Sequence, residues 1–183
     1  AAASTPGMTL LVTGGRILRP DHTVERADVR IDTDGDIDAI GDLERTERDQ
    51  PLDAEGGLVT PGFVNAHGHA AMTLLRGYAD DKPLDAWLQE DIWPGEAERQ
   101  AEDVAAGTRL GIAEMIRSGT TAFADMYFFM PAVVEVVEET GLRARLGHGC
   151  ISVGKDDADA REDFREGLDF AREYDDYGDG RVQ

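Results

Sequence analysis

The chain has 183 residues, of which 41% are hydrophobic, and it carries a formal net charge of −20 at pH 7. This apolar fraction is sufficient for a packed core and argues against a disordered chain. No run of about 18 uncharged apolar residues is present, which excludes a transmembrane helix. The negative charge would repel phosphate backbones and anionic lipids, so we expect neither a nucleic-acid nor a membrane partner.

The acidic residues are spread along the whole chain, which is typical of the solvated surface of salt-adapted proteins. Cys150 is the only cysteine and allows no internal disulfide, as is usual in a reducing compartment. Residues 1–7 lack a basic segment followed by an apolar one, so no secretory signal is expected there. Together these features favour the cytoplasm.

Residues 9–40 alternate short apolar segments with turns, which predicts a small β unit. The Asp34-Gly35 pair is a strong signal for a β-hairpin. Residues 42–57 are polar and lack periodicity, so we expect a linker that contains one more strand. These features define a first domain over residues 1–57.

From Leu58 onward the pattern predicts strands that alternate with helices. Residues 58–66 predict a buried strand, and residues 72–100 form a long connection of a kind that is usually functional. The elements predicted after it are a helix over 103–118, a strand over 121–124, a helix over 131–140, a strand over 143–151 and a helix over 158–174. This alternation is typical of βαβ units with a parallel sheet, so the predicted fold class is α/β.

Three β/α pairs account for the second domain, residues 58–183, and residues 178–183 have the pattern of the start of a fourth strand. A closed (β/α)8 barrel needs roughly 250 residues. The second domain is too short for a whole barrel, so we expect an open set of three units.

His67 and His69 come directly after the strand predicted over residues 58–66. Side chains two apart in a strand point to one face, so both imidazoles can reach the same metal ion. Neutral imidazole is a preferred ligand of zinc and of iron, and the carboxyl end of a barrel strand is where such folds carry their chemistry. Two ordinary histidines are the alternative, but half of the four histidines lie here, which favours a metal site.

The sequence around these histidines resembles the opening motif of the amidohydrolase superfamily. The motif reads Pro61-Gly-Phe-Val-Asn-Ala-His-Gly-His-Ala70. Further similar segments are residues 71–80, 87–88, 92–94, 114–121 and 123–129. The resemblance runs from about Thr9 to Ile151 and points to the branch that holds 5′-methylthioadenosine/S-adenosylhomocysteine deaminases and the related chlorohydrolases.

The resemblance implies that residues 58–183 are the first part of a (β/α)8 barrel and that residues 1–57 contribute to a small β-sandwich. It matches His67 and His69 with the first two ligands of one divalent metal ion, which is zinc or, as the alternative, iron. It matches Glu96 with the glutamate that holds the ribose hydroxyls of a nucleoside, a role that two acceptor oxygens can fill. Without the resemblance, Glu96 would be one surface acid among 38 aspartates and glutamates.

Two positions depart from the pattern of similar enzymes. Gly68 stands where threonine or cysteine is more usual, and we expect little effect on metal ligation. His148 stands where an arginine usually contacts the substrate, and histidine has neither a fixed charge nor a planar fork. His148 is therefore either a substrate-binding residue or a polar residue at a strand end.

The activity that the resemblance implies is hydrolytic deamination of adenosine-type nucleosides, with a small-molecule nucleoside as substrate. The alternatives are deamination of cytosine or guanine, triazine dechlorination, and an inactive truncated remnant. The family draws its other metal ligands and its proton-transferring acids from later strands, so we expect no catalytic residue within this chain, which is interpreted as an N-terminal piece. The sequence is compatible with a homo-oligomer.

Overall fold

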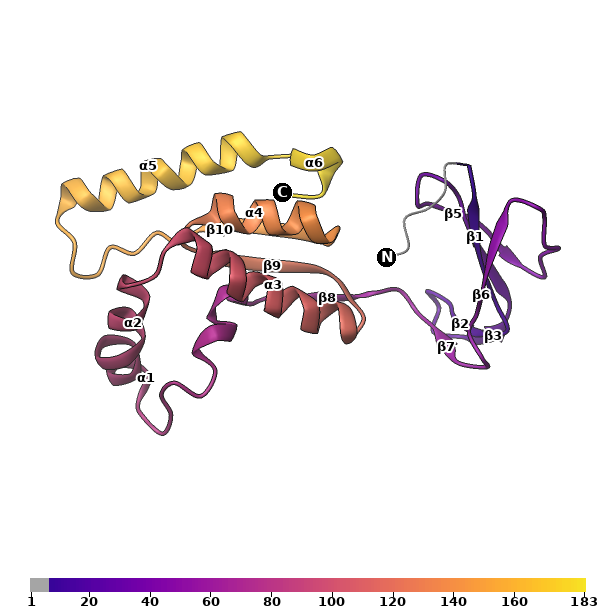
Figure 1. The fold of residues 1–183 in the computed structure, drawn as a ribbon, viewed down its shortest axis with the longest axis horizontal. Coiled ribbons are helices and arrows are strands. Elements are labelled where there is room, and N and C mark those ends of the chain that lie inside the picture. Colours follow the sequence, from indigo (N-terminus) through magenta and orange to yellow (C-terminus); the bar gives the residue numbers. More distant parts are fainter. Residues whose placement is uncertain (1–6) are drawn as a thin grey trace. The chain divides into compact units, whose positions relative to one another are not determined.

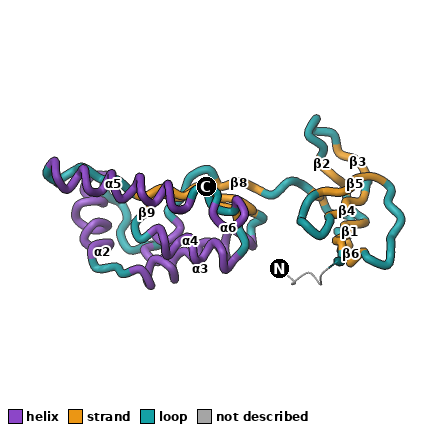
Figure 2. The backbone as a smooth tube through the Cα atoms, turned by 90° about the horizontal axis from the view of Figure 1, so that it is seen from above, coloured by secondary structure: helices purple, strands orange, loops and turns teal. Residues whose placement is uncertain are grey.

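A computed structural model describes residues 7–183, which form two compact units, and the chain passes from the first to the second between Pro61 and Gly62. We expect no secretory signal in residues 1–7, and residues 1–6 of this segment lie outside the described residues. Every helix described lies in the unit Gly62–Gln183, whereas the first unit consists of strands and loops (Figure 2). Within the described part of the chain, no helix has the length and apolar character needed to cross a membrane.

The first unit contains two small sheets. The strands of the four-stranded sheet are, in spatial order, β5 (Ile37–Gly41), β4 (Asp28–Ile31), β1 (Thr9–Thr13) and β6 (Asp49–Asp53). Those of the three-stranded sheet are β3 (Val24–Arg26), β2 (Arg16–Leu18) and β7 (Leu58–Val59). The hairpin predicted at Asp34-Gly35 joins β4 to β5, and β6 is the additional strand predicted within residues 42–57.

Asp49 is the polar centre of this unit, and its side chain is fully buried. The carboxylate accepts hydrogen bonds from Thr9 Oγ1 (2.5 Å), from Arg30 Nε (3.0 Å) and Nη2 (2.9 Å), and from the Thr46 amide (2.7 Å). The Arg30 guanidinium, followed by the Thr9 hydroxyl, holds the pKa of this carboxyl well below its usual range. Strands β1, β4 and β6 are therefore joined through one ionised side chain.

We expect Asp49→Asn to lower the thermal unfolding midpoint of the full-length protein by about 5 °C or more at pH 7, because it leaves the Arg30 guanidinium without a buried negative charge beside it. The carboxyl pKa is lower in the folded than in the unfolded state, so its contribution is complete above about pH 4 and is lost as the pH falls. The difference between variant and wild type should therefore shrink under acid. Calorimetry between pH 3 and 7 measures this, with Asp34→Asn in the exposed hairpin as control, and equal midpoints at pH 7 would contradict it.

The second unit is built on three parallel strands, as the βαβ pattern predicts (Figure 1). The strands are, in spatial order, β10 (Arg143–His148), β9 (Thr120–Tyr127) and β8 (Phe63–Asn65). The longer helices are α3 (Ala101–Arg117), α4 (Met130–Thr140) and α5 (Asp157–Tyr174), and α6 (Tyr177–Gly180) is a short one. After α6, Val182 forms a parallel bridge with Ala144 of β10, where the start of a fourth strand is predicted.

The structure corrects the prediction of one buried strand over residues 58–66. Leu58 and Val59 pair with β2 in the first unit, so the predicted boundary after residue 57 falls before a strand of the small unit. The separate strand β8 pairs only with β9 among the described residues, and Phe63 and Val64 are 62% and 69% exposed. Their apolar side chains suggested burial, but little of the described chain covers either face of β8.

The connection over residues 72–100 is more helical than the sequence suggested. It contains, with the residues just before it, η1 (Ala70–Leu75), α1 (Leu84–Ala86), the π-helix η2 (Trp87–Ile92) and α2 (Trp93–Ala97). The Trp87 indole donates to the Ala79 carbonyl oxygen (3.2 Å), and Ile92 is only 1% exposed. These tertiary contacts order a segment whose sequence has no clear helical period.

Helices α3 and α4 begin and end at residues that the sequence marks. Gln100 and Asp103 form a capping box at the start of α3, and Gly119 follows its end with a φ of +84°. Pro131 lies in the first turn of α4, and Gly141 ends it with a φ of +78°. The predicted limits of both helices are thus confirmed to within two residues.

Helix α3 packs closely against η1, the segment that follows His69. A Cβ at Gly107 would lie 2.3 Å from the Ala71 carbonyl oxygen, so only glycine permits this approach. Helix α4 supplies much of the core through four buried valines, Val133, Val134, Val136 and Val137. The helices thereby hold the backbone next to the predicted metal ligands.

Candidate functional site

The carboxyl ends of β8, β9 and β10 lie at one edge of the parallel sheet. His67 and His69 follow β8, residues 125–127 end β9, and His148 ends β10. The carboxyl edge of a parallel sheet is where such folds carry their chemistry. The sequence predicted His67, His69 and His148 at strand ends, whereas it predicted Glu96 in the long connection.

His67 and His69 lie in the turn between β8 and η1, after the strand has ended at Asn65. Their ring centroids are 5.1 Å apart and the rings meet edge to face. His69 Nδ1 lies 2.7 Å from the Met126 carbonyl oxygen. A carbonyl oxygen can only accept, so Nδ1 carries the proton and Nε2 keeps a lone pair for a metal ion.

Asp125 lies behind His69 and was not predicted as a site residue. Its Oδ2 atom accepts a hydrogen bond from the Ala70 amide (3.1 Å), and its Oδ1 atom is 4.0 Å from His69 Nδ1. Oδ1 has no hydrogen-bond partner among residues 7–183, although the side chain is fully buried. Burial raises the pKa of this carboxyl, and the Ala70 amide and His69 oppose the rise.

These contacts fit a divalent metal ion. A metal-binding histidine normally donates its second ring N–H to a carbonyl or carboxylate, as His69 does to Met126, and nearby acidic groups strengthen the imidazole as a ligand. A signal for Asp125 existed in the sequence, namely an acidic residue inside the apolar strand Thr120–Tyr127. A catalytic zinc site normally has three protein ligands and a water, so two imidazoles would supply only part of such a site.

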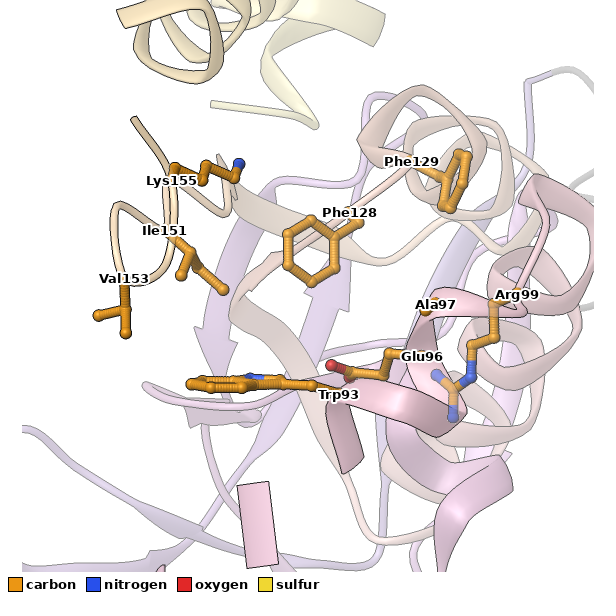
Figure 3. Close-up of a pocket in the computed structure, with 9 residues that line it drawn as sticks. All are labelled: Trp93, Glu96, Ala97, Arg99, Phe128, Phe129, Ile151, Val153 and Lys155. Carbon is orange, nitrogen blue, oxygen red and sulfur yellow. The ribbon is translucent and has the colours of Figure 1, made fainter. Parts of the chain in front are cut away.

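Glu96 lies on α2 beside a cavity of about 400 Å³. The carboxylate points between Trp93 and Phe128 in the close-up of this cavity (Figure 3). The other residues that line the cavity are Ala97, Arg99, Phe129, Ile151, Val153 and Lys155. The cavity therefore combines aromatic surface with one carboxylate and two cationic side chains, Arg99 and Lys155, and the aromatic surface with the carboxylate suits a flat ring joined to a group that carries hydroxyls.

The end of β9 connects Glu96 with His69. Glu96 Oε1 accepts a hydrogen bond of 2.5 Å from the Tyr127 hydroxyl, and the carbonyl of the preceding residue, Met126, holds His69. The rings of His69 and Tyr127 are 6.4 Å apart between centroids. The structure thus brings together three of the predicted site residues, His67, His69 and Glu96.

His148 is not among the residues that line the Glu96 cavity. Its Nε2 atom lies 3.3 Å from Asp163 Oδ1 on α5, and Lys155 Nζ lies 3.1 Å from the other oxygen of the same carboxylate. His148, Cys150 and Asp163 lie close enough for a metal ion, but the ammonium group of Lys155 already neutralises the one carboxylate among them. This cluster is better explained as a link between the end of β10 and α5.

Comparisons with known proteins place the chain in a family. The model of the amidohydrolase family matches residues 58–183. A 5-methylthioadenosine/S-adenosylhomocysteine deaminase of Natronomonas pharaonis is 62% identical over 176 residues, which are 96% of this chain and 40% of that protein. A 5′-deoxyadenosine deaminase of Methanococcoides burtonii is 47% identical over 175 residues, which are 94% of this chain and 40% of that protein.

Among solved structures, a zinc-bound adenosine deaminase of Xanthomonas campestris superposes with a TM-score of 0.70 at 33% identity. The superposition covers 96% of this chain and 42% of that one. The chain spans about 40% of the length of the curated relatives. Because the family model covers more than half of its residues, the chain belongs to the amidohydrolase family.

Proposed function

We propose that this chain is part of a metal-dependent deaminase that hydrolyses the exocyclic C–N bond of adenosine-type nucleosides. The observation that carries the proposal is that two neighbouring residues at the end of β9 contact the two predicted site residues. The Met126 carbonyl oxygen hydrogen-bonds to His69, and the Tyr127 hydroxyl hydrogen-bonds to Glu96. In this proposal His69 is a metal ligand and Glu96 is the carboxylate that binds the sugar, and both contact the end of β9. The names of the most similar relatives support 5′-methylthioadenosine and S-adenosylhomocysteine as substrates.

In this proposal His67 and His69 hold one divalent ion, for which the zinc of the Xanthomonas campestris structure is the precedent. A bound ion of this kind supplies an activated water for attack on the amine-bearing carbon. The His69–Met126 hydrogen bond fixes the imidazole tautomer, and Asp125 fixes the turn that follows through the Ala70 amide. Further metal ligands and the acids that transfer protons come from outside residues 1–183, from later strands of a (β/α)8 barrel.

The same proposal assigns the ribose hydroxyls to Glu96 and the aromatic walls of the cavity to the nucleoside. An ionised carboxylate offers about four acceptor positions, so it can serve Tyr127 and two sugar hydroxyls together. Of the two alternatives for His148, we infer the structural one, because its ring pairs with Asp163 on α5 and it is not among the residues that line the cavity. The first unit contributes to the small β-sandwich, and the second provides the first three units of the barrel.

A substrate panel on the full-length, zinc-loaded protein tests this function. We expect kcat/KM to be at least about 100-fold higher for adenosine, 5′-methylthioadenosine and S-adenosylhomocysteine than for guanine, cytosine or a chlorotriazine. The physical reason is that the bases and the triazine have no sugar for the Glu96 carboxylate to bind. A preference for guanine, cytosine or the triazine would refute the proposal and favour that other substrate. If no compound is turned over, the protein is an inactive one.

A further inference from the structure

Arg99, Tyr127 and Glu96 form a chain of hydrogen bonds beside the cavity. Arg99 Nη1 donates to the Tyr127 hydroxyl oxygen, and the hydroxyl donates in turn to Glu96 Oε1 at 2.5 Å. Arg99 and Tyr127 are 9% and 4% exposed, respectively. The chain of hydrogen bonds therefore joins two residues that line the cavity, Arg99 and Glu96, through a buried tyrosine.

The direction of these bonds is fixed by chemistry. A guanidinium group can only donate, so Arg99 must use a lone pair of the Tyr127 oxygen. The single hydroxyl proton of Tyr127 is then left for Glu96, which as a carboxylate can only accept. Burial, together with the Glu96 carboxylate, raises the pKa of the Tyr127 hydroxyl, so this group stays a donor over the physiological range.

Packing also fixes the position of Tyr127, which donates to Glu96. Tyr127 belongs to the buried core of the second unit, and its backbone carbonyl accepts from the Gly149 amide (2.8 Å). The Arg99 guanidinium carbon lies 5.9 Å from the Tyr127 ring centroid. Among the described residues, Arg99 Nη2 is buried without a hydrogen-bond partner, so Arg99 is held here at an energetic cost.

We propose that Tyr127 and Arg99 are positioning residues that fix the Glu96 carboxylate in the orientation needed to accept from the two vicinal hydroxyls of ribose. This inference rests on the proposed function. The Tyr127 bond occupies one acceptor position on Oε1, and the remaining positions are available to the sugar. A carboxylate without this bond would rotate about its side-chain torsions and would pay the entropy of ordering when the substrate binds.

The test uses Tyr127→Phe in the full-length zinc enzyme, because phenylalanine keeps the buried ring and removes only the hydroxyl. Deamination of adenosine is compared with that of 2′,3′-dideoxyadenosine, which lacks both hydroxyls that Glu96 would bind. We expect kcat/KM for adenosine to fall about tenfold, mostly through KM, while the value for the dideoxy compound changes less than about twofold. Arg99→Met should have a smaller effect in the same direction.

Tyr174→Phe is the matched control, since it removes a hydroxyl from α5 and should leave kcat/KM unchanged for both substrates. In a Glu96→Gln background, Tyr127→Phe should no longer alter the preference for adenosine over the dideoxy compound. Equal losses on both substrates would show that Tyr127 is merely structural, and unchanged kinetics would also overturn the inference. If the wild type deaminates neither compound, the proposed function itself fails, and the inference fails with it.

Discussion

His69→Ala in the full-length protein is expected to lower kcat/KM for adenosine by about a thousandfold or more. The variant loses the Nε2 lone pair that the Met126 carbonyl keeps free for a metal ion. Under the proposed function, an ion without this ligand would be bound weakly and could no longer supply an activated water. Loss of activity and loss of metal should therefore occur together.

Zinc per chain is measured by atomic absorption on the fraction that elutes from gel filtration at the wild-type volume, so that metal loss is distinguished from misfolding. His22→Asn is the matched control, because His22 lies in the first unit at a φ of +66° and asparagine tolerates that conformation. The control should keep both zinc and turnover. A His69→Ala protein that retains full zinc content and activity would refute the assignment of this histidine.

Residues 1–183 expressed alone are expected to show no deamination of adenosine or 5′-methylthioadenosine. Catalysis requires a metal ion with its full ligand set and groups that transfer protons to the leaving amine. Among the described residues, His67 and His69 offer two imidazoles, and Asp125 lies behind them at 4.0 Å from the His69 ring. The isolated material should also aggregate readily, since β8 is an edge strand with exposed Phe63 and Val64.

The measurement is the ultraviolet change on deamination, recorded after equilibration of the purified chain with zinc. Full-length protein prepared in the same way serves as the positive control. Turnover by residues 1–183 that disappears in His67→Ala would contradict this prediction, because the chemistry assigned to other parts of the protein would then lie within this chain.

Local order in this protein follows from the sequence. Asp34-Gly35 predicts the hairpin between β4 and β5, and Pro131 and Gly141 mark the limits of α4. These features depend on backbone preferences that act within a few residues, such as the fixed φ of proline and the positive φ open to glycine. The pair His67 and His69 also stands out locally, because two imidazoles follow one apolar strand.

The contacts that give those histidines and Glu96 their surroundings depend on the tertiary structure. Met126 and Asp125 meet His69 across more than fifty residues, and Tyr127 reaches Glu96 from another element. No local preference encodes such pairs, because the packing of β9 between β8 and β10 decides which side chains meet. The same reason explains why the burial of β8 was mispredicted, because apolar side chains do not say which element covers a strand. It also explains why the role of His148 was left open, because the residue type does not say which side chain it contacts.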